Sequence, residues 1–172
     1  GGILAVVLVV FIINAINLID GVDGLASGLS AVACFYYGIV FFNIGHYTYS
    51  LIAFVTLGVI VPFFIYNVFG KAENQKKIFM GDTGSLFLGG VISVLAIGMK
   101  LPLILVIAGF VYLFETLSVI LQVASFKLTG KRIFKMSPIH HHFELSGWSE
   151  TRVVANFTIV TVLLCLLGFI AL

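Results

Sequence analysis

Charged residues are scarce in this sequence: Asp, Glu, Lys and Arg make up 9% of its 172 residues, against about 25% in a typical soluble domain. Hydrophobic residues make up 61%. This balance excludes an ordinary water-soluble fold around one core, and the net charge of +2 gives no indication of nucleic-acid binding. We therefore expect an all-α protein embedded in a lipid bilayer, with no nucleic acid as a partner.

Cysteine is almost absent. Cys34 and Cys165 both lie inside apolar runs, where a thiol behaves as a small core residue, so we expect neither a disulfide framework nor a zinc site. The chain starts at Gly1-Gly2 and enters an apolar run without a basic flank, which is not the pattern of a signal peptide. We interpret it as part of a longer membrane protein.

Long apolar runs are what the sequence has in abundance. Six approach or exceed the roughly 20 residues that a spanning helix needs: Ile3–Asn17, Leu25–Phe42, Tyr49–Phe69, Ser85–Met99, Pro102–Phe126 and Val153–Leu172. The first and fourth are short, so we expect each to gain a turn from flanking residues. The sequence predicts a polytopic transmembrane helical bundle of about six spanning helices, with residues 1–172 forming a single domain.

Basic residues are distributed unequally between the connections. Lys100 alone lies on one side of the predicted membrane, whereas eight lie in the connections 17–24, 70–84 and 127–152: Lys71, Lys76, Lys77, Lys127, Lys131, Arg132, Lys135 and Arg152. The positive-inside rule places these three connections in the cytoplasm, with both ends of the chain outside. All the motifs that suggest chemistry fall on this cytoplasmic side.

The first motif is rich in Asn and Asp. Asn14, Asn17 and Asp20 recur at every third residue, so they share a face of the first helix if it continues to its last turn. Two glycines allow a tight turn that brings Asp20 close to Asp23. Carboxylate and amide oxygens are ligands that Mg²⁺ accepts. The alternative is an Asx-rich turn in which Asp23 caps the next helix.

The second motif places Asp82 between Gly81 and Gly84, directly before an apolar run. Asp82 is either an N-cap of the following helix or a metal ligand in a glycine-rich turn, where the helix dipole also favours phosphate. Because the first motif lies on the same predicted side, we favour a shared Mg²⁺ site.

The third motif contains three consecutive histidines, His140, His141 and His142, within the run 137–144. Packing alone does not explain such a cluster. Imidazoles near a diphosphate can donate hydrogen bonds or carry a proton. The basic residues upstream attract an anionic donor or anionic lipid headgroups, or serve only as a topology signal.

A polar stripe follows the fifth apolar run, at Glu115, Ser118, Gln122 and Ser125. A carboxylate within the membrane is costly, so Glu115 should face protein or a water-filled groove, as a structural hydrogen-bond partner or as a functional group. Gln122, nearer the cytoplasmic end, is a candidate for substrate contact, and Asn67 near the end of the third run is a similar case.

Together the motifs resemble those of the polyprenyl-phosphate N-acetylhexosamine-1-phosphate transferases. The stretches 17–26 and 79–86 are similar to signatures shared across that family, and the run 137–144 with 147–150 is similar to the loop of its phospho-N-acetylmuramoyl-pentapeptide transferases. The resemblance covers essentially the whole chain, as the C-terminal six of the family's ten spanning helices. It implies transfer of phospho-MurNAc-pentapeptide from UDP-MurNAc-pentapeptide to undecaprenyl phosphate, giving lipid I and UMP at the bacterial plasma membrane. A homodimer is also compatible with it.

The resemblance also implies roles for single residues. Asp82 matches the Mg²⁺ ligand, and Asp20 lines the catalytic pocket with Asn17 and Asn14. Asp23, Asn67 and Phe79 belong to the uridine pocket, with Phe79 stacking on the base. The diphosphate or sugar region is contacted by Gln122, His140 and His141, the two histidines with a catalytic role, and His142 is assigned to substrate binding.

One departure concerns the family's adjacent Asp pair, because this sequence contains no Asp-Asp. We therefore expect the chain to be inactive alone. Three alternatives stay open: a sister transferase that uses UDP-GlcNAc, a transporter with an ion site at Glu115, and a non-catalytic membrane scaffold. Because the polar residues gather at one predicted membrane face rather than at its middle, the sequence favours an enzyme over a transporter.

Overall fold

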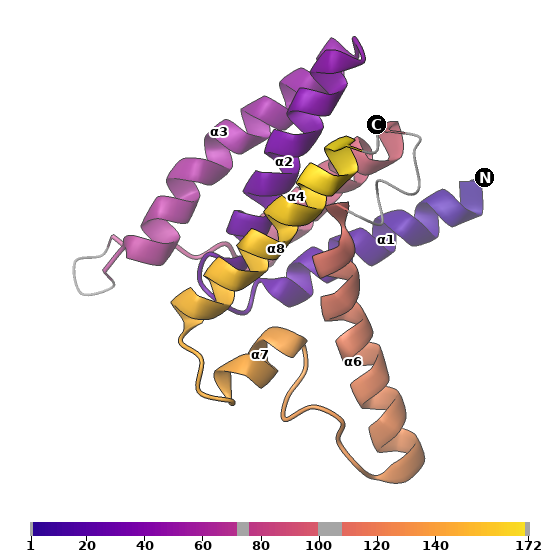
Figure 1. The fold of residues 1–172 in the computed structure, drawn as a ribbon, viewed down its shortest axis with the longest axis vertical. Coiled ribbons are helices and arrows are strands. Elements are labelled where there is room, and N and C mark those ends of the chain that lie inside the picture. Colours follow the sequence, from indigo (N-terminus) through magenta and orange to yellow (C-terminus); the bar gives the residue numbers. More distant parts are fainter. Residues whose placement is uncertain (1, 72–75, 100–107, 171–172) are drawn as a thin grey trace.

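The computed structural model describes residues 2–71, 76–99 and 108–170, and all the regular secondary structure within these ranges is helical. These described ranges contain six long helices and one short one: α1 (Gly2–Ile19), α2 (Leu25–Asn43), α3 (Tyr47–Phe69), α4 (Gly81–Gly98), α6 (Phe110–Thr129), α7 (Ile139–Glu144) and α8 (Glu150–Ile170) (Figure 1). All but α7 are long and apolar enough to cross a membrane. The predicted all-α transmembrane bundle is therefore confirmed. Positions 102–107 and 171–172 of the predicted runs, and the predicted connection at Lys100, lie outside the described residues.

The two short apolar runs gain a turn, as predicted. Helix α1 continues to Ile19, and α4 begins at Gly81. These extensions matter for the site, because Asp20 now follows the last residue of α1 and Asp82 lies in the first turn of α4. Helix α7, which carries the three histidines, was not predicted, because its six residues lack any apolar periodicity.

Close packing between helices depends on small residues. Helix α1 packs along α4, and α2 lies between α3 and α8 (Figure 1). A Cβ atom at Gly89 of α4 would lie 2.7 Å from the Cα of Ile13 in α1, and one at Gly38 of α2 would lie 2.8 Å from the ring of Phe54 in α3. Glycine therefore lets the α1 and α4 backbones approach closely, and it makes room for the Phe54 ring against α2.

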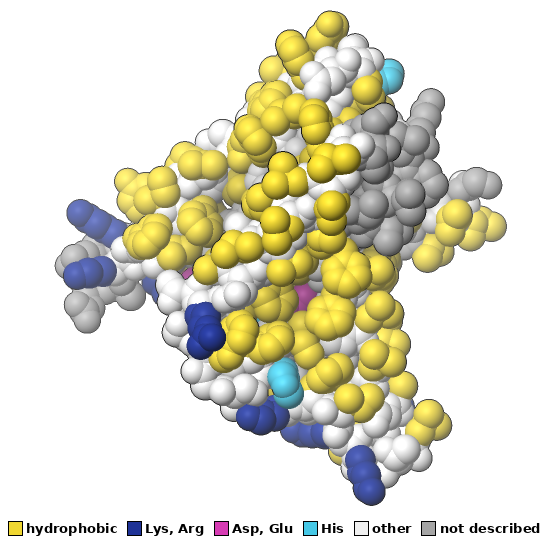
Figure 2. Space-filling view, viewed as in Figure 1, with side chains coloured by type: hydrophobic (Ala, Val, Ile, Leu, Met, Phe, Trp, Pro, Cys, Tyr) yellow, Lys and Arg dark blue, Asp and Glu magenta, His cyan; other side chains and the backbone are white. Residues whose placement is uncertain are grey.

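Large hydrophobic side chains cover the outside of the bundle. In Figure 2 they spread over the helices, whereas Lys and Arg side chains lie at the left and lower margins of the view. Helix α8, for example, exposes Leu163, Leu166 and Leu167 by more than half. Multi-pass membrane proteins have such an apolar exterior, with basic side chains gathered toward one end, as the described Lys and Arg residues are here.

Candidate functional site

The turn after α1 adopts its shape because of two glycines. Gly24 has φ = 84°, a left-handed conformation that glycine adopts without strain. Gly21 serves a different purpose: a Cβ there would lie 3.1 Å from Nε2 of His140 and 3.3 Å from Nε2 of His141. Its lack of a side chain lets the third motif lie directly against the first.

Asn67 joins the first two motifs. From the end of α3 its Oδ1 accepts the backbone N–H of Gly24 at 2.6 Å, while its Nδ2 donates to the backbone oxygen of Ile78 at 2.9 Å and to Asp23 Oδ1 at 3.2 Å. Asp23 also forms an ion pair with Lys77. The alternative in which Asp23 caps α2 is wrong, because Gly24 occupies the N-cap and no side chain caps that helix.

Asn17 connects α1 to α4. Its Nδ2 donates to Asp82 Oδ1 at 3.1 Å and to Ser85 Oγ at 2.9 Å. Asp82 is not the N-cap, which is Met80, but lies in the first turn with its side chain exposed. An acidic group there interacts favourably with the positive end of the helix dipole and still has an oxygen available for a ligand.

A cavity of about 450 Å³ lies where these motifs meet. Five of its lining residues were predicted as site residues, namely Asp20, Asp23, Asn67, Phe79 and Asp82. Glu150, at the start of α8, also lines it but was given no role from the sequence, although it stands in the quoted stretch 147–150. Because these residues come from four separate connections or helix ends, only the folded chain brings them together.

Negative charge accumulates in this cavity. The pKa of Asp20 is raised from 3.8 to about 6, first by partial burial and then by the charges of Asp82 and Asp23. Asp23 is paired with the ammonium group of Lys77, and the hydrogen bond from this group to the Asp23 carboxylate raises the pKa of Lys77. A cavity in which carboxylates repel one another is a favourable place for a cation.

The donor set fits the Mg²⁺ that the resemblance implies. Within the described ranges no group of three His, Cys, Asp or Glu side chains is arranged to hold a metal ion. Mg²⁺ does not need such a cage, since proteins often hold it with one or two carboxylates while waters and substrate phosphates complete the shell. Asp82, with the carboxylate of Asp20 in the same cavity, provides hard oxygen ligands of this kind.

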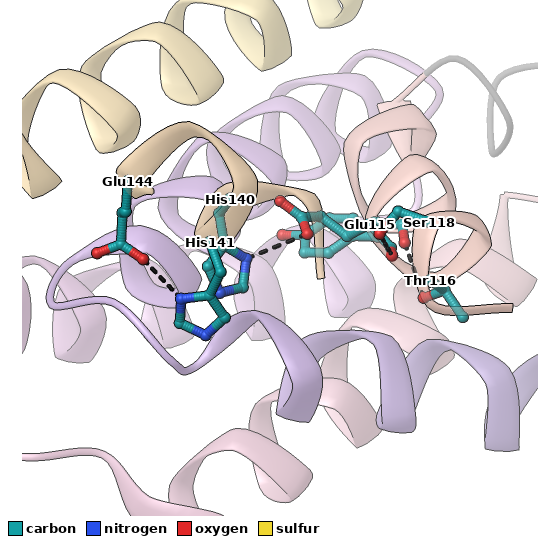
Figure 3. Close-up of polar contacts among 7 residues, drawn as sticks. Glu115, Thr116, Ser118, His140, His141 and Glu144 are labelled. Carbon is teal, nitrogen blue, oxygen red and sulfur yellow. Dashed lines mark hydrogen bonds and ion pairs between the residues drawn. The ribbon is translucent and has the colours of Figure 1, made fainter. Parts of the chain in front are cut away.

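The histidines fall into two environments (Figure 3). His140 is completely buried, and its Nδ1 lies 3.1 Å from Oε2 of Glu115 in α6. His141 is half-buried, with Nδ1 2.6 Å from Oε2 of Glu144 and Nε2 close to Gly21. The expectation that Glu115 faces protein is thus confirmed, with a hydrogen-bond partner that spacing alone did not identify.

Six of the eleven predicted site residues do not line this cavity: Asn14, Asn17, Gln122, His140, His141 and His142. The Asn14 amide donates to the backbone oxygen of Val10 within α1. Gln122 is occupied by the segment that follows α6: its Oε1 accepts the N–H groups of Ile133 and Phe134, and its Nε2 donates to the Phe134 oxygen.

His142 is similarly engaged, because its Nδ1 accepts the N–H of Lys135 at 3.0 Å. In this structure Gln122 and His142 bind the backbone of residues 133–135. Their predicted contacts with substrate stay predictions.

Comparison with known proteins identifies relatives of the chain. A model of the family described as Glycosyl transferase family 4 matches residues 2–100. The phospho-N-acetylmuramoyl-pentapeptide-transferase of Clostridium botulinum is 51% identical over 148 residues, which are 86% of this chain and 44% of that protein. The protein of that name from Clostridium kluyveri is 53% identical over 148 residues, covering 86% of this chain and 45% of the relative.

The chain thus spans less than half the length of these curated relatives. The match extends over most of the chain, including motifs from which the resemblance was inferred, and that resemblance is confirmed. The chain belongs to glycosyl transferase family 4.

Proposed function

We propose that the protein carrying this chain transfers phospho-MurNAc-pentapeptide from UDP-MurNAc-pentapeptide to undecaprenyl phosphate, with Mg²⁺ as cofactor. The products are lipid I and UMP, and the reaction belongs to peptidoglycan synthesis. The single observation that carries the proposal is the meeting of Asp20, Asp23, Asn67 and Asp82 in one cavity at the end of an apolar bundle. The names of the relatives support the choice of substrates.

The residues of the cavity suit a reaction between two anions. The phosphate of the acceptor lipid is a monoester with a second pKa of about 6, so it is largely ionised at neutral pH and needs no strong base. Mutual repulsion of nucleophile and diphosphate is then the main barrier, and phosphoryl transfer depends on positioning and charge neutralisation. Mg²⁺, when bound at Asp82, supplies that neutralisation.

Each residue then has a defined task. Asn17 holds the Asp82 carboxylate through its hydrogen bond at 3.1 Å. Asn67 fixes the turn that carries Asp23 and so shapes the pocket for uridine. Phe79, which is 70% exposed at the edge of the cavity, is free to stack on the base. His141 donates Nδ1–H to Glu144 and presents Nε2 beside the turn, where the imidazolium form can donate Nε2–H to the diphosphate.

We further propose that the charged connections face the cytoplasm, because both substrates carry phosphate and the eight Lys and Arg residues follow the positive-inside distribution. The bilayer is that of the bacterial plasma membrane. A homodimer stays a prediction, as does the inactivity of the chain when expressed alone.

A sister transferase that uses UDP-GlcNAc is the second candidate. It has the same chemistry, and the cavity around Asp20 and Asp82 suits it equally. The 137–144 run and the names of the relatives favour the muramyl donor. The transporter alternative loses support, because Glu115 has a partner in His140 and because the relatives are named as transferases.

The test is UMP release by the longest natural protein that carries this sequence, in membranes supplied with undecaprenyl phosphate and Mg²⁺. UDP-MurNAc-pentapeptide and UDP-GlcNAc are offered separately. We expect release from the muramyl donor only, and its loss in Asp82→Asn. Release from UDP-GlcNAc alone would identify a sister enzyme, and no release from either donor would leave the scaffold alternative.

A further inference from the structure

The most deeply buried polar pair in the described structure lies outside the cavity. Glu115 of α6 and His140 of α7 both have 0% exposed side chains, and His140 Nδ1 lies 3.1 Å from Glu115 Oε2 (Figure 3). Neither residue lines the cavity that contains Asp20 and Asp82. Any role of the pair in catalysis must therefore be exerted through another part of the chain.

The pair has one free polar atom at each end. Glu115 Oε1 and His140 Nε2 are buried without a hydrogen-bond partner. Nε2 faces the turn after α1, since a Cβ added at Gly21 would lie 3.1 Å from it. The ring of His140 is thus placed between the Glu115 carboxylate and the backbone next to Asp20.

Burial of the Glu115–His140 pair, with one unpartnered polar atom on each side chain, costs folding free energy. A buried carboxylate or imidazole loses its hydration, and replacing such pairs by apolar residues of similar size is often neutral or stabilising. Apolar side chains would fill the space between α6 and the turn without an unpartnered oxygen and nitrogen. A carboxylate can fix the orientation of the imidazole, because it accepts a hydrogen bond from one particular ring nitrogen. An apolar residue cannot do this.

We propose that Glu115 is a positioning residue. It accepts the Nδ1–H of His140 and so directs the Nε2 edge of that ring against Gly21. This contact fixes the turn after α1 and thereby sets the position of the Asp20 carboxylate in the cavity. The proposal rests on the proposed transferase function. It assigns to the first histidine of the motif a task different from substrate contact, which His141, being half-buried and closer to solvent, can perform.

Three variants of the longest natural protein separate orientation from filling of space. Glu115→Leu removes the acceptor, Glu115→Gln keeps an oxygen that accepts Nδ1–H, and Thr116→Val is the matched control, since its hydroxyl only bonds the Tyr112 oxygen in the same helix. We expect Glu115→Leu to lower kcat for UMP release about 10–100-fold, by analogy with the loss found when the hydrogen-bond partners of metal-ligating histidines are removed. KM should change less than twofold, Glu115→Gln should recover most of the activity, and Thr116→Val should match wild type.

Gly21→Ala provides a second route to the same defect, because its methyl group would lie 3.1 Å from Nε2 of His140 and 3.3 Å from Nε2 of His141, so both rings must shift by a few tenths of an ångström. If both changes act on one element, the double variant Glu115→Leu/Gly21→Ala loses little more kcat than either single variant. Additive losses would overturn the proposal, as would a loss in Glu115→Gln equal to that in Glu115→Leu.

A readout without activity separates this proposal from the proposed function. In protein labelled with ¹⁵N at histidine and purified in detergent, His140 should carry its proton at Nδ1, lose that signature in Glu115→Leu and keep it in Glu115→Gln. Assignment of the signal comes from its absence in His140→Gln. An unprotonated Nδ1 in wild type, or an unchanged signal in Glu115→Leu, would overturn the proposal even if UMP release is confirmed. If wild type releases no UMP from any donor, the proposed function fails while the orientation of His140 is still measured.

Discussion

Replacing Asp20 by Asn is expected to stabilise the folded protein at neutral pH, although Asp20 is proposed to serve catalysis. The folded state holds the Asp20 carboxyl partly buried and close to Asp82 and Asp23, so its pKa rises from 3.8 to about 6. A folded-state pKa above the unfolded value means that the proton stabilises the native state at low pH. That contribution is lost as the pH rises from about 4 through about 6.

The size of the effect follows from the pKa difference. A difference of about 2 pH units corresponds to about 3 kcal/mol, at 1.36 kcal/mol for each unit. Solvent screens a side chain that is only partly buried, so we expect a gain of about 1 kcal/mol for Asp20→Asn at pH 8. For a domain of this size, 1 kcal/mol raises Tm by about 2–4 °C.

Thermal unfolding in detergent with EDTA, followed at pH 4 and pH 8, tests this reasoning. Asp20→Asn should unfold at a higher temperature than wild type at pH 8 and at nearly the same temperature at pH 4. Asp23→Asn is the control, because Asp23 is paired with Lys77 and its replacement should not raise Tm. A lower Tm for Asp20→Asn at pH 8, or an equal gain at both pH values, would refute it.

Three further predictions concern helix packing, the Mg²⁺ site and the stacking of Phe79 on the uridine base. Gly89→Ala should destabilise the bundle by about 1–3 kcal/mol, because the new methyl group would lie 2.7 Å from the Cα of Ile13. Gly90→Ala is the control and should be neutral, since its methyl group would have no neighbour within 4 Å. Thermal unfolding in detergent measures the difference in Tm between the two variants. Mg²⁺ should raise the Tm of wild type but not of Asp82→Asn, and an equal rise in both would place the cation elsewhere. Phe79→Ala should raise KM for the UDP donor with kcat nearly unchanged, since stacking aids binding of the donor before the reaction, and steady-state kinetics of UMP release measure this.

The fold could be predicted because hydrophobic length is a local property. A run of about 20 apolar residues specifies a spanning helix wherever it occurs, and the six helices follow from six runs. The extension of α4 back to Gly81 was also foreseen, since its predicted run was short. Helix α7 was not, because six residues containing three histidines carry no periodic signal and depend on packing against α6 and α8.

The site was predictable only as a set of residue types. Asp20, Asp23 and Asp82 were recognised because carboxylates beside glycine turns at helix ends suit a hard cation, and the structure brings them to one cavity. Which partner each polar group takes depends on tertiary contacts. Spacing could not show that Gln122 bonds the 133–134 backbone or that His140 pairs with a carboxylate 25 residues earlier.

The most direct test of the central claim is the mass of the lipid product. Membranes containing the longest natural protein with this sequence are incubated with undecaprenyl phosphate, UDP-MurNAc-pentapeptide and Mg²⁺, and the lipids are extracted and analysed by mass spectrometry. The account predicts undecaprenyl diphosphate carrying MurNAc-pentapeptide, formed with one UMP for each product and absent in Asp82→Asn. Unchanged undecaprenyl phosphate in wild-type membranes, or equal product from Asp82→Asn, would contradict it.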